Sequence, residues 1–139
     1  MRPAVFDASV VVRPFLPVEG AERALLATRR FAMVAPSLLL VEAANAFWKY
    51  VRRGIAPLED CQAALRHLSG YADLRPDMGL YDDALELAAR LEHPVYDCLY
   101  LALARREAYP LISADRRLLA LADDRLGLEA IALTEFDEN

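Results

Sequence analysis

The sequence predicts an α/β fold in which helices cover both faces of a mostly parallel sheet. Two observations lead to this prediction. Short apolar stretches, such as PAVF at 3–6 and LIS at 111–113, have the length and composition of buried strands. Longer segments with apolar residues at helical spacing lie between them. Strands that alternate with helices need crossover connections, and such connections make neighbouring strands parallel.

Five segments are predicted to be strands, each short and mainly apolar. They are residues 3–7, FAMVAP at 31–36, ADLRP at 72–76, PLISAD at 110–115 and LEAIALT at 128–134. Ligands bind at the carboxyl ends of the strands in sheets of this kind. The residues that end these strands are therefore the first candidates for a functional site.

The segments between the strands are predicted to be helices. Ser9 is the expected N-cap of a short helix that Pro14 and Pro17 limit. The strongest helix runs from Ser37, its predicted N-cap, to residue 53, and Gly54 follows it in the position that favours glycine. Further helices are predicted at 19–29, 57–70, 79–92, 95–108 and 116–124.

Length and composition describe one soluble globular unit. With 139 residues, 56% hydrophobic and 27% charged, the chain is long enough to bury a sizeable core, so we expect a single domain over residues 1–139. The apolar runs SLLLV and LYLALA are too short to cross a membrane, and the N-terminus lacks a secretory signal pattern. Cys61 and Cys98 have no CxxC neighbour, so we expect buried thiols in a cytoplasmic protein.

The charge balance argues against nucleic-acid binding by bulk electrostatics alone, because the formal net charge is −5. Lys49 is the only lysine among the 16 basic residues. The rest are arginines, and several form adjacent pairs, such as Arg105-Arg106 and Arg116-Arg117. These pairs are suited to phosphate binding, but they are also explained as solvated helix ends or as a compositional bias towards arginine.

Four acidic residues stand inside apolar stretches. Asp7 ends the first predicted strand and Asp115 the fourth, while Asp97 lies in the first turn of the predicted helix at 95–108. Each of these aspartates is also explained as a helix cap or a dipole partner. Glu42 is harder to explain, because the residues three and four positions away from it in its helix carry no positive charge. A narrow water-facing strip remains the alternative for Glu42.

The four acids together favour a divalent-cation site. Carboxylates that lie close together repel one another and become partly protonated unless a cation neutralises them. A ligand set of oxygens, with no histidine or cysteine, selects Mg²⁺ or Mn²⁺ over zinc. One such ion, or a pair, can activate water and hold a phosphodiester for hydrolysis.

Four motifs in fixed order resemble the PIN-domain ribonucleases of the VapC type. They are VFDASVVV, PSLLLVEAANAFWK, PVYDCLYLALA and LISADRRLL, and the resemblance extends over nearly the whole chain. VapC proteins are the toxin half of bacterial or archaeal type II toxin–antitoxin pairs. The resemblance implies a three-layer α/β/α PIN-like fold with a mostly parallel central sheet.

The resemblance also implies which residues form the site. The family's metal-binding acids match Asp7, Glu42, Asp97 and Asp115. Ser9 matches a supporting hydroxyl residue, and Ser113 stands where threonine is usual and keeps the hydroxyl. Some relatives carry a further acid two residues beyond the last aspartate. This sequence has Arg117 at that position, so we expect no fifth ligand.

The activity implied by the resemblance is cleavage of RNA by an endoribonuclease that depends on Mg²⁺ or Mn²⁺. It also implies a homodimer and inhibition by a cognate VapB-type antitoxin whose tail reaches the acidic site. In our hypothesis Asp7, Glu42 and Asp97 contact the metal directly, and Asp115 binds a second metal or orients water. The only histidines, His67 and His93, have no clear partner in the sequence, and we interpret His93 as local structure.

Other protein classes fit the sequence less well. A haloacid-dehalogenase-type phosphatase needs a second aspartate where Ser9 stands, and its downstream lysine is missing. A response-regulator receiver also needs a lysine that this sequence lacks, and the sequence lacks both the lysine and the glycines of a Walker nucleotide-binding loop. The remaining alternative is a catalytically inactive PIN-like module that binds RNA or protein.

Contacts with RNA are predicted for basic residues near the expected mouth of the site, namely Arg13, Arg116 and Arg117. Phe47, Trp48 and Tyr50 could stack on bases. Because these aromatics follow helical spacing, packing in the core or in a dimer is the alternative explanation.

Overall fold

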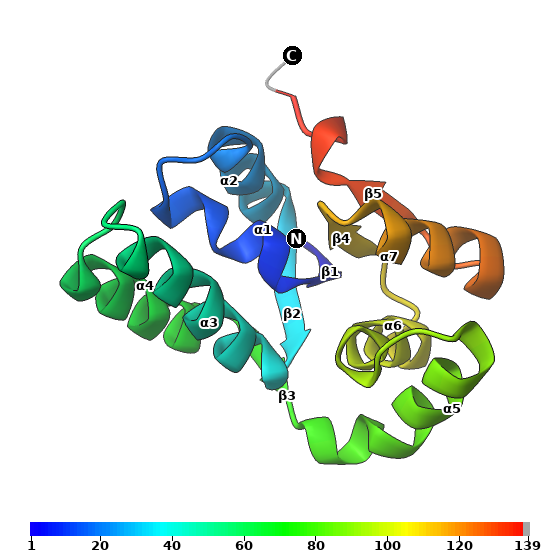
Figure 1. The fold of residues 1–139 in the computed structure, drawn as a ribbon. Coiled ribbons are helices and arrows are strands. Elements are labelled where there is room, and N and C mark those ends of the chain that lie inside the picture. Colours follow the sequence, from blue (N-terminus) through cyan, green and yellow to red (C-terminus); the bar gives the residue numbers. More distant parts are fainter. Residues whose placement is uncertain (138–139) are drawn as a thin grey trace.

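A five-stranded parallel sheet forms the centre of the computed structural model, which describes residues 1–137 (Figure 1). The strands are β1 (Arg2–Phe6), β2 (Phe31–Pro36), β3 (Asp73–Arg75), β4 (Leu111–Ser113) and β5 (Ala130–Ala132). Their order across the sheet is β3-β2-β1-β4-β5, and every neighbouring pair is parallel. The prediction of five strands in a parallel sheet is confirmed, although β4 ends two residues before Asp115.

Seven α-helices lie between the strands in the described part of the chain. They are α1 (Ala8–Val11), α2 (Ala21–Arg30), α3 (Leu38–Arg52), α4 (Leu58–Tyr71), α5 (Tyr81–Leu91), α6 (Val95–Glu107) and α7 (Arg116–Ala120). Short 3₁₀ turns occupy η1 (Arg13–Phe15), η2 (Asp77–Leu80) and η4 (Leu133–Glu135). The helix predicted at 116–124 is α7 followed by the π-helical segment η3 (Leu121–Arg125).

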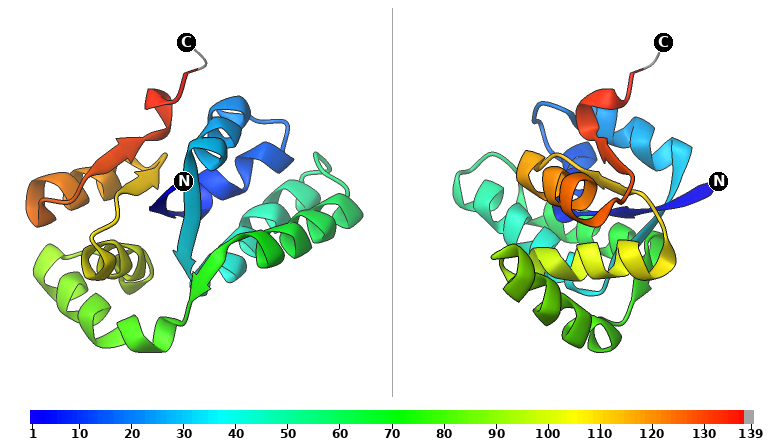
Figure 2. Two further views of the ribbon diagram at one scale, coloured as in Figure 1. Left: turned by 180° about the vertical axis from the view of Figure 1, so that it is seen from behind. Right: turned by 90° about the vertical axis from the view of Figure 1, so that its right-hand side faces the viewer.

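The helices form two layers, with α1 to α4 on one side of the sheet and α5 to α7 on the other (Figures 1 and 2). This division follows from the strand order. The chain steps outward from β1 to β2 and β3, then returns to β4 and β5 on the other side of β1. Right-handed crossovers in opposite directions place their helices on opposite faces. The predicted three-layer α/β/α fold is therefore confirmed.

The reversal of direction places β1 beside β4, and Phe6 is in register with Ile112. In open α/β sheets such a reversal leaves a crevice at the carboxyl ends of the two strands. The loops that follow β1 and β4 meet at this crevice, and they carry Asp7 and Asp115.

Helix α6 is the most deeply buried helix, since every residue from Cys98 to Ala104 is buried. It packs between the sheet and α5. The apolar run LYLALA therefore belongs to the core. Both cysteines, Cys61 and Cys98, are buried free thiols, as predicted. None of the helices over residues 1–137 combines the length and apolar character that a membrane span requires.

Two helix starts differ from the sequence prediction. The N-cap of α1 is Asp7, which accepts a hydrogen bond from the backbone N–H of Ser9, so the prediction of Ser9 as the cap is wrong. Strand β1 ends at Phe6, and the helix begins as soon as a capping carboxylate is available. Ser37 does occupy the N-cap of α3, but the carboxylate of Asp77 accepts the N–H of Leu38 at 3.1 Å.

Replacement of Leu101 by alanine should lower the free energy of unfolding by about 2–5 kcal/mol, because this side chain is fully buried in α6 and leaves a cavity. The same change at Leu85 in α5, where the side chain is 61% exposed, should cost about 0.5 kcal/mol or less. Urea unfolding of the two variants measures the difference. Equal losses would contradict the placement of α6 in the core.

Candidate active site

Asp7 lies at the centre of the site, at the end of β1 and at the start of α1. Its side chain is 6% exposed. Both carboxylate oxygens accept hydrogen bonds: Oδ1 from the backbone N–H and hydroxyl of Ser9, and Oδ2 from the hydroxyl of Ser113. The carboxylate is thus fixed from two sides.

The two serines connect the loops that follow β1 and β4. The hydroxyl of Ser9 donates to Asp7 and accepts the backbone N–H of Ala114 at 3.1 Å. The hydroxyl of Ser113 donates to Asp7 and accepts the backbone N–H of Asp115 at 2.9 Å. Each hydroxyl therefore uses one donor and one acceptor direction to tie the loops together. Both serines that were predicted to support the site therefore contact Asp7, and their functional role stays a prediction.

The environment of Asp7 disfavours its charged form. Burial raises the pKa of Asp7 to about 6, from an ordinary value of 3.8, and the hydrogen bonds from Ser113 and Ser9 offset only part of this effect. The negative charge of Asp115 raises the pKa of Asp7 further. Asp115 is therefore close enough to act electrostatically on Asp7.

Glu42 enters the site from α3 and is bound by a residue that sequence reasoning missed. The hydroxyl of Tyr100, in α6, donates to Oε1 of Glu42 at 2.6 Å. Burial raises the pKa of Glu42, and the charges of Asp97 and Asp77 raise it further. A signal for Tyr100 existed in the sequence, because it follows Asp97 by three positions and shares its helix face.

Tyr100 lies within the field of three carboxylates. Burial, followed by the charges of Glu42, Asp7 and Asp97, raises the pKa of Tyr100 well above its ordinary value. The phenol therefore stays protonated and remains a hydrogen-bond donor to Glu42. Three of the four predicted acids thus act on this one side chain.

Asp97 lies in the first turn of α6 and is partly exposed. Its Oδ2 lies 2.7 Å from Nε2 of His93, whose side chain is 5% exposed. The expectation that His93 has no clear partner is therefore wrong. His67, by contrast, lies away from the acids and stacks on Tyr71 at a ring-centroid distance of 5.6 Å.

Asp115 is the most accessible of the four acids and is the N-cap of α7. Its Oδ1 accepts the backbone N–H groups of Arg117 at 2.9 Å and Leu118 at 3.3 Å. The capping explanation considered for the aspartates thus holds for Asp7 and Asp115. Over residues 1–137, no three acidic, histidine or cysteine side chains are spaced to hold a metal ion jointly.

Comparison with known proteins assigns this arrangement to a family. A family model described as "PIN domain" matches residues 4–124. The chain belongs to the PIN domain family. It is 30% identical over 118 residues to a protein named Ribonuclease VapC3 from Pyrobaculum aerophilum, and the match includes 82% of this chain and 90% of the relative. The predicted resemblance to VapC-type PIN proteins is confirmed.

A solved structure supports the fold of this PIN domain. The crystal structure of PAE2754 from Pyrobaculum aerophilum matches with a TM-score of 0.75 and 23% sequence identity. The match covers 96% of this chain and 85% of that chain. Because 96% of this chain is covered, the likeness extends beyond residue 124, where the family match ends.

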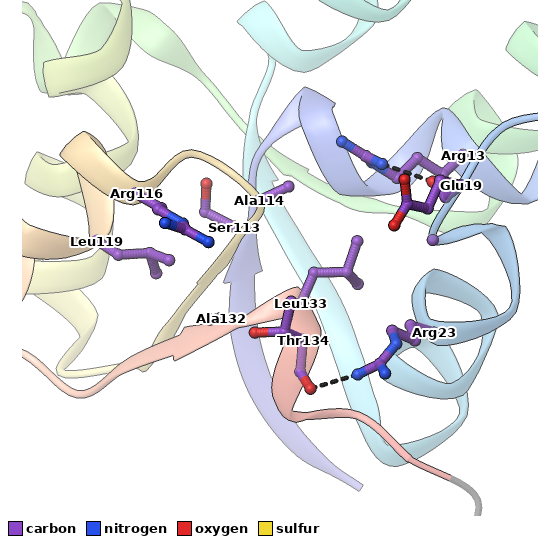
Figure 3. A pocket seen from close by; sticks show the side chains of 11 residues that line it. Arg13, Glu19, Arg23, Ser113, Ala114, Arg116, Leu119, Ala132, Leu133 and Thr134 are labelled. Carbon is purple, nitrogen blue, oxygen red and sulfur yellow. Dashed lines mark hydrogen bonds between the residues drawn. The ribbon is translucent and has the colours of Figure 1, made fainter.

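The PIN domain carries a basic cavity of about 280 Å³ beside Ser113. Arg13, Arg23 and Arg116 line it from three elements, and Figure 3 shows their side chains around the opening. The guanidinium of Arg13 donates to the backbone carbonyls of Ser9 at 2.7 Å and Glu19 at 2.6 Å, which fixes its position. Arg117 is exposed on α7 outside the lining of this cavity.

Phe47 and Trp48, two of the aromatic residues of α3, have different environments in the PIN domain. Phe47 is 3% exposed and meets Phe15 edge to face at a centroid distance of 6.2 Å. Core packing is therefore the correct explanation for Phe47. Trp48 is 50% exposed and lies under the guanidinium of Arg52, at 5.1 Å from the ring centroid.

Replacement of Asp7 by asparagine should stabilise the metal-free protein, and more so at higher pH. Because the pKa of Asp7 is raised to about 6 in the folded state, the folded protein binds this proton more tightly than the unfolded chain. Its stability contribution is present below pH 4 and is lost as the pH rises towards 6. Asp7→Asn has no carboxyl group at this position, so its free energy of unfolding does not undergo this decrease of about 3 kcal/mol.

Urea unfolding in EDTA at pH 4.5 and 7.5 measures this effect. The free energy of unfolding of Asp7→Asn relative to the parent should increase between the two pH values. The exposed Asp123, changed to asparagine, serves as the matched control and should show no such increase. A constant difference for Asp7→Asn would show that burial does not disfavour its charge.

Proposed function

We propose that this PIN domain is an endoribonuclease of the VapC toxin type, which cleaves RNA with Mg²⁺ or Mn²⁺ at the acidic site. The observation that carries the proposal is the arrangement of Asp7, Glu42 and Asp97 around Tyr100, with Asp115 acting on Asp7. The similarity to a protein named as a ribonuclease supports it. We further propose that residues 1–139 form one domain.

The donor chemistry of the site fits a hard divalent cation, because every candidate ligand atom is a carboxylate oxygen. Glu42, Asp97 and Asp115 each commit one oxygen to hydrogen bonds, and the other oxygen of each has no hydrogen-bond partner within residues 1–137. Oδ1 of Asp7 accepts two hydrogen bonds from Ser9, whereas Oδ2 accepts one from Ser113 and so keeps a second lone pair for a cation. Asp7, Glu42 and Asp97 would hold the ion directly, and Asp115 would bind a second ion or orient water.

A bound Mg²⁺ or Mn²⁺ would supply activated water and neutralise charge on the phosphodiester. The chain supplies the rigid support for that chemistry. Ser9 and Ser113 fix the carboxylate of Asp7. Tyr100 orients Glu42 through its hydroxyl. Asp115, the most accessible acid, is suited to a second ion or to orienting water.

Arg116 is proposed to contact an RNA phosphate next to the cleaved bond. It lines the basic cavity beside Ser113, whose hydroxyl binds Asp7. Arg13 lines the same cavity, and its contacts with two backbone carbonyls hold it in place. Arg117, at the exposed start of α7, is proposed as a more distant contact.

The proposed partners follow from the VapC-type assignment. We propose a cognate VapB-type antitoxin as the inhibitor, a homodimer as the assembly and the cytoplasm as the location. The buried free thiols of Cys61 and Cys98 are consistent with a reducing compartment. A basic antitoxin segment would be attracted to the acidic site by the same charges that bind the cation.

The replacement Asp7→Asn tests the proposed activity. It should reduce cleavage of RNA in Mg²⁺ or Mn²⁺ to the level of the parent in EDTA, because a metal-binding carboxylate is lost while the amide keeps the shape. Asp123→Asn, on the exposed surface of η3, should cleave as the parent does. Cleavage of a labelled mixed RNA pool is followed on gels, with folding checked by circular dichroism.

Two results would contradict the proposal. Equal metal-dependent cleavage by Asp7→Asn and the parent would remove Asp7 from the active site. Absence of cleavage in a parent protein that binds Mn²⁺ would favour the inactive binding module instead.

The replacement Arg116→Ala tests the proposed phosphate contact. It should weaken RNA binding and reduce the slope of log affinity against log salt by about 1, because one phosphate contact is lost. Mn²⁺ binding should be unchanged. Arg125→Ala, an exposed arginine at the end of η3, should leave the slope as in the parent. The slope is measured by fluorescence anisotropy between about 50 and 300 mM salt, roughly the range over which phosphate contacts weaken. An unchanged slope for Arg116→Ala would argue against this role.

A further inference from the structure

Asp97 occupies an unusual position for a carboxylate in the first turn of a helix. The N-cap of α6 is Pro94, which makes Asp97 the third residue of the helix. An acidic residue there commonly reaches back to the backbone N–H of the N-cap residue. Proline has no N–H. The usual capping contact is therefore impossible, and helix capping does not explain how Asp97 is oriented.

The partner of Asp97 is His93, the residue before Pro94. Nε2 of His93 lies 2.7 Å from Oδ2 of Asp97. The imidazole is 5% exposed, whereas Asp97 is 31% exposed and faces the site. Burial restricts the ring to one orientation, so the contact fixes one carboxylate oxygen and leaves the other directed elsewhere.

The backbone of His93 is fixed on both sides. Its N–H donates to the carbonyl of Ala88 at 3.2 Å, and its carbonyl accepts the thiol of Cys98 at 3.7 Å. Glu92, directly before it, adopts the left-handed conformation with φ of 52° and ends α5. Such a turn is uncommon for a residue with a side chain and is maintained by its surroundings. The loop between α5 and α6 thus presents the ring to Asp97.

The contacts of the ring determine where its proton lies. Nε2 faces a carboxylate oxygen, which requires an N–H at that nitrogen. Nδ1 is buried and has no hydrogen-bond partner within residues 1–137. An N–H there would be a buried donor without an acceptor, which is costly. The contacts therefore assign the donor N–H to Nε2.

We propose that His93 is a positioning residue that orients the Asp97 carboxylate for cation binding through the Nε2–H donor. The proposal rests on the proposed function, since it takes Asp97 as a ligand. Hydrogen-bond partners behind metal ligands typically change metal affinity by about 10–100-fold when removed. His93 contributes in this way without contacting the cation or the RNA.

Three replacements separate this role from packing. In His93→Gln the amide nitrogen is as many bonds from Cβ as Nε2 is, so the donor to Asp97 is kept. His93→Asn is a matched amide whose side chain is one carbon shorter and does not reach. His93→Leu removes the donor and fills the buried position with an apolar side chain. Mn²⁺ affinity is measured by calorimetry, and thermal unfolding shows which variants are folded.

We expect His93→Gln to bind Mn²⁺ within about threefold of the parent, and His93→Asn and His93→Leu to bind about 10–100-fold more weakly. Parent-like binding by His93→Leu overturns the proposal, as does equal weakening of folded His93→Gln and His93→Asn. A parent that binds Mn²⁺ but does not cleave RNA contradicts the proposed function, while the affinity series still decides the role of His93. A parent that binds no Mn²⁺ overturns both the proposed function and the proposed role of His93.

The position of the proton is tested without any variant, metal or RNA. Long-range ¹H–¹⁵N NMR of the metal-free parent at pH 7.5 distinguishes the two neutral forms of the imidazole. We expect the hydrogen on Nε2 of His93. A hydrogen on Nδ1 with none on Nε2 would overturn the proposed donor geometry.

Discussion

The hydrogen bonding of one buried carboxylate connects the fold to the site. Asp7 receives the hydroxyls of Ser9 and Ser113, which belong to the loops after β1 and β4. These strands are neighbours because the chain reverses direction across the sheet at β1. Without the two hydroxyls, a carboxylate at this depth would keep only the hydrogen bond from the backbone N–H of Ser9, and its burial would be more unfavourable. The candidate site therefore lies where the sheet brings the loops after β1 and β4 together.

The same burial disfavours the charged forms of the carboxylates, and a bound cation would offset this effect. Burial raises the pKa of both Asp7 and Glu42, and neighbouring acids add to the effect. Tyr100 stabilises Glu42 through a neutral hydroxyl and contributes no positive charge. Within residues 1–137, no salt bridge joins Asp7, Glu42 or Asp115 to a basic side chain. The nearby arginines line a separate cavity, where they suit a polyanion.

Helix α6 serves both the core and the site. Its residues from Cys98 to Ala104 are buried, which makes the helix a rigid support. Asp97 and Tyr100 lie three positions apart on it, so both side chains reach the acidic edge from an immobile element. His93, in the loop before it, binds Asp97 from behind. Core packing and site geometry thus depend on the same segment.

The sequence by itself determined the alternation of strands and helices, the parallel sheet and the family, because periodicity and local motifs are read directly from neighbouring residues. The four acids come from the same motifs, and their role as a metal site stays a prediction. The sequence placed the α1 cap at Ser9 instead of Asp7, because a strand end is not marked by periodicity alone. Only the tertiary structure decided that Ser113 meets Asp7 across 106 residues and that Tyr100 meets Glu42 across 58. Those contacts depend on strand register and helix packing. The pairing of His93 with Asp97 was missed although it is local, since Pro94 breaks the helical pattern from which such a pair is inferred.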